Sequence, residues 1–284
     1  MRTPRPIWLL ALLAPGLLLV IALVFLPLVE MAKASLHLQD LGVIQPGLTL
    51  DNYIGILGSP AYFELFYKTA AAALAVTLID ALLAYPVALH LVAAPPRRKA
   101  MLYFLVAAPL LINTVVRTYA WMLVLGNRGV VNTLLISMGV TDEPIRLSGN
   151  VVGMMIGATQ VFLPFMILAL AASLESIDRR LIESAEILGA GRMRRFITIT
   201  LPLSMPGLVA GSVLVFSLML GAIVTPLMLG GSAVRYVSVQ VFTDAMVLFD
   251  LPRATALSAL LLVAVLAIYV AQRRYLRSYQ ERAA

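Results

Sequence analysis

Two groups of polar residues stand out in a chain that is 61% hydrophobic and could each serve a function. The first is the stretch from Glu183 to Gly207, ESAEILGAGRMRRFITITLPLSMPG, which holds two Glu, three Arg and three Gly. Its charge and glycine content are typical of a docking segment or a membrane-surface segment. The second group lies inside apolar runs, where a polar side chain is costly and is therefore a candidate for a functional role such as contact with a solute. Its members are Asp80, Arg117, Tyr119, Trp121 and Gln160.

The common catalytic constellations are missing from the sequence. A phosphate-binding loop needs a lysine after glycine, and none of Lys33, Lys68 and Lys99 follows one. His37 and His90 are too far apart for a zinc motif, and there is no cysteine to add a thiolate ligand or nucleophile. No G-x-S-x-G nucleophile motif occurs either. The sequence therefore predicts a chain that is not an enzyme, with no catalytic residue, no metal site and no cofactor of its own.

The elements that carry these residues are long apolar segments. With a mean hydropathy of +0.96 and only 12% charged residues, the chain predicts an all-α, polytopic membrane protein. The first segment could alternatively be a cleaved signal peptide, but its apolar run is longer than the usual signal core. We expect six transmembrane helices, at Ile7–Leu28, Thr69–Ala94, Met101–Gly126, Val151–Leu174, Leu208–Leu229 and Ala254–Ala271.

The distribution of basic residues predicts the orientation of these helices. With a cytoplasmic N-terminus, fourteen Lys and Arg fall on the inside, six fall on the outside, and Arg117 lies within a span. The positive-inside rule favours this arrangement, with both termini cytoplasmic in a bacterial-type inner membrane. Most of the net charge of +7 then reflects topology, so nucleic-acid binding is not expected. Residues 29–68, 127–150 and 230–253 become outer loops.

The polar stretch 183–207 then belongs to a cytoplasmic loop, residues 175–207. Asp178 is a plausible N-cap for a short amphipathic helix with Leu181, Ile182, Ala185 and Leu188 on one side, and Gly189 is its natural stop. A second short helix would follow, with Met193, Phe196, Ile197 and Leu201 on its apolar side, and Pro202 would mark its end or a kink. The residues alone leave two readings open, a docking surface and a helix pair lying on anionic lipid.

This loop resembles the EAA loop of permeases from ABC importers. Glu183-Ser184-Ala185, three residues, Gly189, nine residues and Ile199-Thr200-Leu201-Pro202 reproduce its spacing, with Ser184 in place of the central Ala as the one departure. The resemblance implies the type I importer permease fold and a single permease domain over residues 1–284. It also implies that the loop docks on an ATPase. The implied coupling residues are Glu183, Ser184, Ala185, Glu186, Gly189, Ile199, Leu201 and Pro202.

Other segments extend the resemblance over nearly the whole chain. Tyr85-Pro86-Val87-Ala88, Leu163-Pro164-Phe165-Met166 and Pro206-Gly207 look most like the spermidine/putrescine-type permeases, the first of two permease subunits. The resemblance implies import of a polyamine or a related small organic ion. The implied partners are a second permease subunit, two ATPase subunits that carry ATP and Mg, and an extracytoplasmic binding protein.

Inside the spans, Asp80 and Arg117 are predicted at similar depths, about 16 and 13 Å below the outer boundary at 1.5 Å per helical residue. They could form a structural ion pair or line the substrate pathway, and Arg117 could instead reach up to the interface. Gln160, four residues before Pro164, could contact solute at a kinked helix or hydrogen-bond a neighbouring helix. Tyr119 and Trp121 could be interface anchors. A rival function, an ATP-independent secondary transporter or channel, gives the EAA-like loop no role and predicts internal repeats that we do not see.

Overall fold

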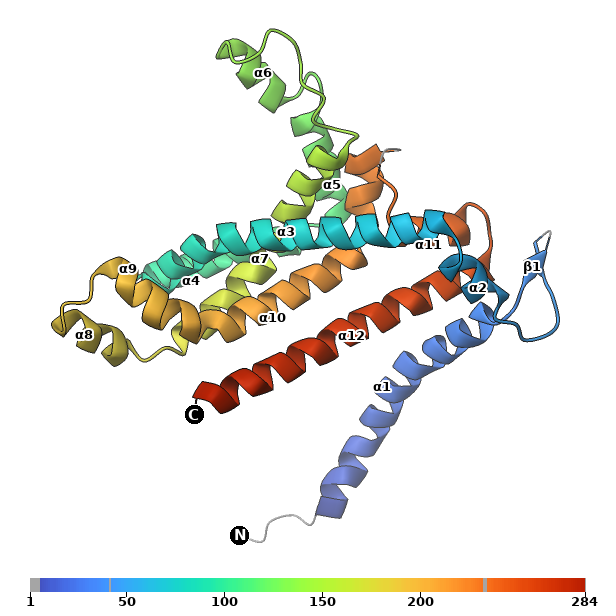
Figure 1. Cartoon of the computed structure of the whole chain (residues 1–284), viewed down its shortest axis with the longest axis horizontal. Helices are drawn as coiled ribbons and strands as arrows, with labels where there is room; N and C mark the ends of the chain where they lie inside the picture. The colour runs from blue at the N-terminus through green and yellow to red at the C-terminus, as the bar shows by residue number, and fades with distance from the viewer. Residues whose placement is uncertain (1–5, 41, 232–233, 284) are drawn as a thin grey trace. The chain divides into compact units, whose positions relative to one another are not determined.

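The structure is a computed structural model that describes residues 6–40, 42–231 and 234–283, and it is almost entirely helical (Figure 1). The all-α prediction is therefore confirmed. Arg2 and Arg5, which enter the predicted topology, lie outside the described residues, as do the side chains of Arg179, Arg277 and Arg282. The chain forms two compact units whose boundaries fall after Phe63, after Val239 and after Leu262.

The first unit joins the N-terminal segment to the turn between the last two helices. A two-stranded antiparallel hairpin, which the sequence did not predict, pairs Gln39 with Ile44 and Asp40 with Val43. The elements of this first unit are α1 (Pro6–Ser35), β1 (Gln39–Asp40), β2 (Val43–Ile44), α2 (Asp51–Leu57), and the adjoining parts of α11 (Val237–Met246) and α12 (Leu251–Ala283). Buried Asp244 closes the α11–α12 turn by accepting a hydrogen bond from Gln240 and an ion pair from Arg253.

The second unit contains the remaining helices. They are α3 (Pro60–Ala93), α4 (Pro96–Ala107), η1 (Ala108–Leu111), α5 (Thr114–Leu125), α6 (Val130–Ser137), α7 (Val151–Glu175), α8 (Arg179–Ile187), α9 (Arg192–Arg195), η2 (Phe196–Thr200), α10 (Leu201–Leu220) and η3 (Pro226–Gly230). The segments η2 and η3 are π-helical turns. Helices α3, α11 and α12 each cross a boundary between the units.

Five helices in the described part of the chain are long and apolar enough to span a membrane, and a bent pair makes six if it is counted as one span. The five single spans are Leu13–Ser35, Pro60–Ala93, Val151–Glu175, Arg192–Leu220 and Leu251–Arg274. The expected membrane fold is thus confirmed. The predicted fourth span agrees with α7 within one residue, whereas the second span begins nine residues before the predicted Thr69.

The third predicted span, Met101–Gly126, is not one straight helix. It is divided between α4 with η1 and α5, and the helical segments that contain them, Pro96–Leu111 and Thr114–Ser137, are bent by 94°. Pro109 cannot donate a backbone hydrogen bond and lies in the short 3-10 turn that ends the first half. Asn113 then caps the second half, because its Oδ1 accepts a hydrogen bond from the N–H of Val115 at 2.8 Å. The apolar run is continuous in sequence, but these two local signals interrupt the helix.

The fifth predicted span, Leu208–Leu229, is shifted toward the C-terminus relative to the observed helix. Helix α10 begins at Leu201 and ends at Leu220, with Gly221 as its C-cap. The apolar residues after Gly221 form a loop and the π-helical turn η3, which packs against α7. The boundary was misplaced because Gly221 and Pro226 end a helix within a segment that remains apolar.

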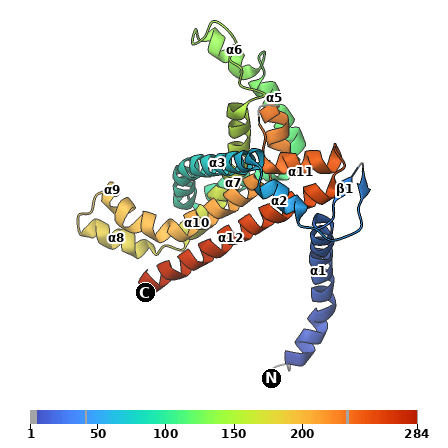
Figure 2. The same cartoon turned by 45° about the vertical axis from the view of Figure 1, so that its right-hand side comes forward.

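Helices α7 and α10 form the centre of the second unit, and both views show them packed side by side (Figures 1 and 2). Glycines allow this close approach. A Cβ atom added at Gly207 would lie 2.3 Å from the Cβ of Ser173, and one added at Gly211 would lie 2.7 Å from the Sδ of Met166. On the other side of α7, a Cβ added at Gly157 would lie 2.3 Å from a methyl carbon of Leu229. The helix spacing therefore depends on residues without side chains.

Candidate functional site

The loop that carries the EAA-like pattern begins with the helix predicted from its capping residues. Asp178 caps α8, since its Oδ1 accepts a hydrogen bond from the N–H of Arg180 at 2.9 Å. At the other end Gly189 adopts a left-handed backbone with φ of +82°. The N–H of Gly189 donates to the carbonyl of Glu186 and the N–H of Ala190 donates to that of Ala185, both at 2.9 Å. This pairing satisfies the last carbonyls of the helix and reverses the chain.

The exposed side of α8 is richer in apolar residues than the sequence pattern indicates. Ile182 and Ala185 are half-buried, as expected for the inner side of an amphipathic helix. Ile187 and Leu188, however, are each 86% exposed, and Leu181 is also exposed. We call Leu181, Ile187, Leu188 and the neighbouring exposed Met193 the α8–α9 patch. Large apolar side chains left exposed on two consecutive short helices favour a contact surface here.

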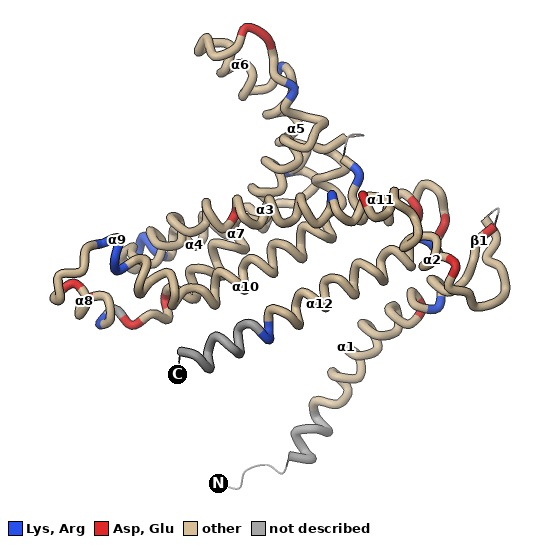
Figure 3. The backbone as a smooth tube through the Cα atoms, in the orientation of Figure 1, with Lys and Arg blue, Asp and Glu red and all other residues tan. Residues whose placement is uncertain are grey.

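An ion pair fixes α8 relative to α9. The Oε2 atom of Glu186 accepts a hydrogen bond from Nη1 of Arg195 at 2.5 Å. Glu186 and Arg195 therefore hold the two short helices together around Gly189, and the side chain of Glu183 is exposed beside them. Figure 3 shows charged residues gathered on α8 and α9, whereas α10, which continues from them, carries none.

From the sequence, Pro202 was expected to mark either the end of the second short helix or a kink in it. The helix does not end there. Instead α9, the π-helical turn η2 and α10 form one continuous helical path from Arg192 to Leu220. Proline cannot donate to the carbonyl four residues earlier, so the backbone before Pro202 must adjust. The wider π-helical turn is that adjustment. Ile199, Leu201 and Pro202 are half-buried within this path, so α8–α9 connects directly to a membrane-spanning helix.

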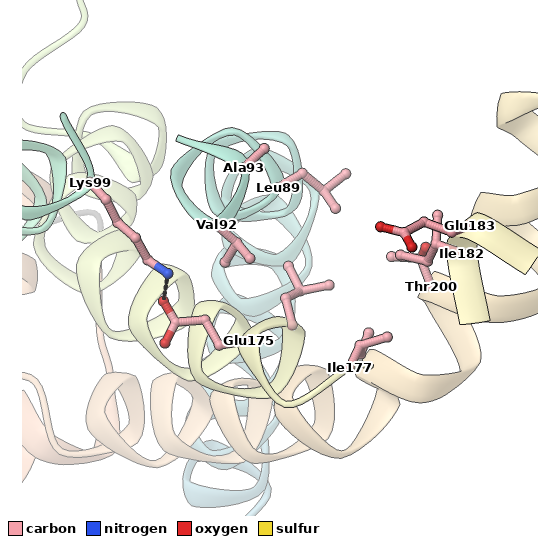
Figure 4. Close-up of a pocket in the computed structure, with 10 residues that line it drawn as sticks. Leu89, Val92, Ala93, Lys99, Glu175, Ile177, Ile182, Glu183 and Thr200 are labelled. Carbon is pink, nitrogen blue, oxygen red and sulfur yellow. Dashed lines mark ion pairs between the residues drawn. The ribbon is translucent and has the colours of Figure 1, made fainter. Parts of the chain in front are cut away.

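A pocket of about 610 Å³ lies between α8 and the ends of α3, α4 and α7 (Figure 4). Ile182, Glu183 and Thr200 form one wall, and Lys99 with Glu175 lies opposite them. The Nζ of Lys99 contacts Oε1 of Glu175 at 2.6 Å, and Tyr103 donates a hydrogen bond to the same oxygen at 2.8 Å. Sequence reasoning missed this Lys99–Glu175–Tyr103 cluster. The available signal was the presence of opposite charges at the cytoplasmic ends of two consecutive predicted spans.

Asp80 lies on the buried side of α3 and has no solvent exposure. Neither of its carboxylate oxygens has a hydrogen-bond partner among the described residues. An isolated carboxylate in an apolar interior is among the costliest groups a protein can hold, so an unpaired acid at this position favours a functional over a structural reading.

Arg117 does not pair with Asp80 among the described residues. Its Nη1 donates a hydrogen bond to the carbonyl of Pro109 at 2.9 Å, and its buried Nε has no hydrogen-bond partner there. Arg117 thus ties α5 back to the turn that interrupts the third span. The ion pair considered from the sequence is not formed in this state, because the predicted depth of Arg117 assumed an unbroken helix.

Two of the other predicted pathway residues contact each other. Nε1 of Trp121 donates a hydrogen bond to Oε1 of Gln160 at 3.1 Å, which links α5 to α7. This is the hydrogen bond between helices that was one of the readings for Gln160. Tyr119 is 55% exposed, in agreement with a surface anchor as much as with a solute contact. Within the described residues no three His, Cys, Asp or Glu side chains are placed to hold a metal ion.

Comparison with known proteins gives a family match over almost the full length. Residues 5–280 match the family described as binding-protein-dependent transport system inner membrane component. The chain is 34% identical over 211 residues to the spermidine/putrescine transport system permease protein PotB of Haemophilus influenzae, covering 74% of this chain and 73% of the relative. It is 36% identical over 210 residues to PotB of Escherichia coli, covering 74% and 76%.

Solved structures show the same fold at lower identity. A chain of a bacterial alginate ABC transporter, crystallised with a periplasmic protein bound to an alginate pentasaccharide, superposes with a TM-score of 0.77. The match covers 94% of this chain and 93% of that chain at 18% identity. A chain of the MetNI methionine ABC transporter in an inward-facing conformation gives a TM-score of 0.57 at 17% identity, covering 75% and 93%.

Proposed function

The chain belongs to the family of inner-membrane components of binding-protein-dependent transport systems, and from this premise we propose its substrate, its partners and its coupling surface. It is a permease subunit of an ABC importer. We propose that it imports a polyamine such as spermidine or putrescine, and that the segment 183–202 transmits the conformational change of an ATPase to the membrane helices. ATP and Mg would be bound by that ATPase and not by this chain.

The observation that carries the coupling role is the α8–α9 patch. Ile187 and Leu188 project from a capped, ion-paired helix at the one place where the EAA-like pattern occurs. Covering two such side chains contributes about 1.5–3 kcal/mol each to an association. An ATPase groove therefore gains most of its affinity from the apolar residues, while Glu183 and Glu186 orient the helix. A lipid surface would instead favour the arginines of α9 and leave the glutamates facing anionic headgroups.

The coupling residues divide into three tasks. Glu183, Ser184, Ala185 and Glu186 form the body of α8 that the ATPase would hold. Gly189 sets the angle of the turn after α8 through its left-handed backbone. Ile199, Leu201 and Pro202 lie in the continuous path into α10, so a displacement of α8–α9 reaches the membrane as a movement of that helix. Contacts that differ between the nucleotide states of the ATPase would supply the driving free energy.

Support for a polyamine substrate comes from the relatives and from Asp80. PotB of two bacteria is named for spermidine and putrescine transport, and the identity to it extends over about three quarters of this chain. A polyamine is a flexible cation, and an unpaired acid within a membrane helix is a natural partner for it. In this proposal Asp80 binds an amine during passage. Tyr119, Trp121 and Gln160 would line the path beside it, and Arg117 would hold the bend of the third span.

We further propose a complete assembly of a second permease subunit, two ATPase subunits and an extracytoplasmic binding protein. The outer loops 29–68, 127–150 and 230–253 would face the binding protein, with both termini on the cytoplasmic side. The fourteen-to-six distribution of basic residues supports this orientation. The single permease domain over residues 1–284 remains a prediction.

The test is to tag this chain, solubilise it gently from its native membrane and identify the copurifying proteins by mass spectrometry. The proposal predicts an ATPase and a second membrane-spanning chain. The binding protein that stimulates ATP hydrolysis by the purified complex would then be titrated with spermidine, putrescine and other small organic ions. A chain that transports solute as a homo-oligomer without an ATPase would refute the proposal.

A further inference from the structure

A single side chain of α3 contacts the helical path from α9 to α10 at two points, at the start of the π-helical turn η2 and just beyond its end. The ring of Tyr85 meets the ring of Phe196 edge-on, with centroids 5.3 Å apart and planes at 84°. The hydroxyl of the same tyrosine lies 2.5 Å from Oγ of Ser204. Phe196 is the first residue of η2, and Ser204 lies in the first turn of α10. Tyr85 therefore spans the π-helical turn from one end to the other.

The hydrogen bond has a defined direction. Oγ of Ser204 donates its one proton to the carbonyl of Leu201 at 3.0 Å, so the hydroxyl of Tyr85 donates to Ser204. Ser204 has no solvent exposure and Tyr85 is buried, so water does not compete for this contact. The edge-on ring geometry with Phe196 is the arrangement that aromatic pairs favour.

Both helices are weakened where they meet. Pro86, which follows Tyr85, cannot donate to the carbonyl of Leu82, and this removes one helical hydrogen bond from α3. On the coupling path, η2 replaces the regular helical pairing just before Pro202. Such interruptions are the places where helices bend and where π-helical turns serve function. The interruption of α3 at Pro86 thus lies next to the residue, Tyr85, that contacts Phe196 in η2.

We propose that Tyr85 is the positioning residue that transmits movement of the coupling segment to α3, and through α3 to Asp80. Asp80 lies five residues before Tyr85 on the same helix, about 7.5 Å along its axis at 1.5 Å per residue, and both side chains are buried. When the ATPase shifts α8–α9, the displacement at η2 moves Phe196 and Ser204 together, and the tyrosine carries α3 with them. The inference rests on the proposed coupling role of segment 183–202.

The test uses the whole importer in proteoliposomes and measures the number of solute molecules taken up per ATP hydrolysed. Tyr85→Phe keeps the ring contact but removes the hydrogen bond, and Ser204→Ala removes the same bond from the other side. Each should lower this ratio, by roughly two- to tenfold if the bond has ordinary strength and forms in one state only. The double variant should be no worse than either single one, because both remove one interaction. Tyr67→Phe is the matched control, since Tyr67 is exposed on the same helix.

Amounts of assembled complex and basal ATP hydrolysis are measured in parallel. An unchanged uptake ratio in Tyr85→Phe and Ser204→Ala would overturn the proposal, as would a loss of uptake that only follows the loss of assembled complex. Gly189→Val, which acts on the coupling turn itself, separates the two ideas. If Gly189→Val abolishes coupling but Tyr85 and Ser204 variants do not, the coupling surface stands and the tyrosine link fails. If none of these variants alters coupling, the proposed function of the segment fails with it.

Discussion

The turn after α8 allows the coupling account to be tested by backbone conformation alone. Gly189 has φ of +82°, and an added Cβ atom would meet nothing within 4 Å. A substitution there causes strain without a clash. A non-glycine residue in this left-handed region costs about 1–2 kcal/mol, so Gly189→Ala should lower the equilibrium ratio of the native turn to other turn conformations roughly 5- to 30-fold. Asparagine tolerates the region better and valine worse, which predicts the order Asn, Ala, Val for increasing damage.

The assay is uptake by proteoliposomes together with ATP hydrolysis stimulated by the loaded binding protein. Gly191→Ala is the matched control, because Gly191 lies two residues away with φ of −63° and equally open surroundings. Its transport should equal that of the unaltered chain. The reasoning would be refuted by equal loss in Gly191→Ala and Gly189→Ala, or by normal transport in Gly189→Val. The prediction would also be contradicted if the loss of transport among the Asn, Ala and Val variants of Gly189 followed side-chain size and not the ease with which each residue adopts the left-handed backbone.

Three further predictions concern other contacts. Arg195→Glu should reduce coupling modestly, since an exposed ion pair is worth about 0.2–1 kcal/mol, and Glu186→Arg should reduce it further because Glu186 also orients the helix on the ATPase. The double reversal should recover only the share of the ion pair, and uptake no better than in Glu186→Arg alone would contradict that share. Gly207→Ala should destabilise the purified chain by about 1–3 kcal/mol in thermal unfolding, because the new Cβ would fall 2.3 Å from that of Ser173 and 2.8 Å from the carbonyl oxygen of Ala169; Ser173→Gly should relieve only the first of these clashes and so recover part of the loss. Asp80→Leu should raise the unfolding temperature while abolishing uptake, because it removes a buried unpaired acid; normal uptake would exclude Asp80 from the pathway.

Local sequence signals predicted helix α8 well. The cap at Asp178 and the left-handed stop at Gly189 depend on residues within one turn of the helix end, so their chemistry can be recognised without tertiary structure. The fourth span was predicted from its continuous apolar run alone, and the structure adds that Asn150 caps it by accepting a hydrogen bond from the N–H of Gly153.

Hydrophobicity alone misplaced boundaries of the second, third and fifth spans, since it reports which segments avoid water and not where the backbone bends. Pro109 and Asn113 break the third span inside an apolar run, and this also invalidated the depth assigned to Arg117. The contacts of Tyr85 with Phe196 and Ser204 lay beyond prediction for another reason. They connect residues more than a hundred positions apart, and they depend on the register of α3 against α10.

The most direct test of the central claim asks what covers the α8–α9 patch in the membrane. The chain has no cysteine, so Ile187→Cys introduces a unique attachment point for a photoactivatable cross-linker. Leu134→Cys, an exposed position on α6, serves as the control. In native membranes the account predicts that light joins the Ile187→Cys chain to an ATPase, with a yield that changes when ATP is added, and that the control forms no such product. Cross-linking of Ile187→Cys to lipid alone would contradict the account.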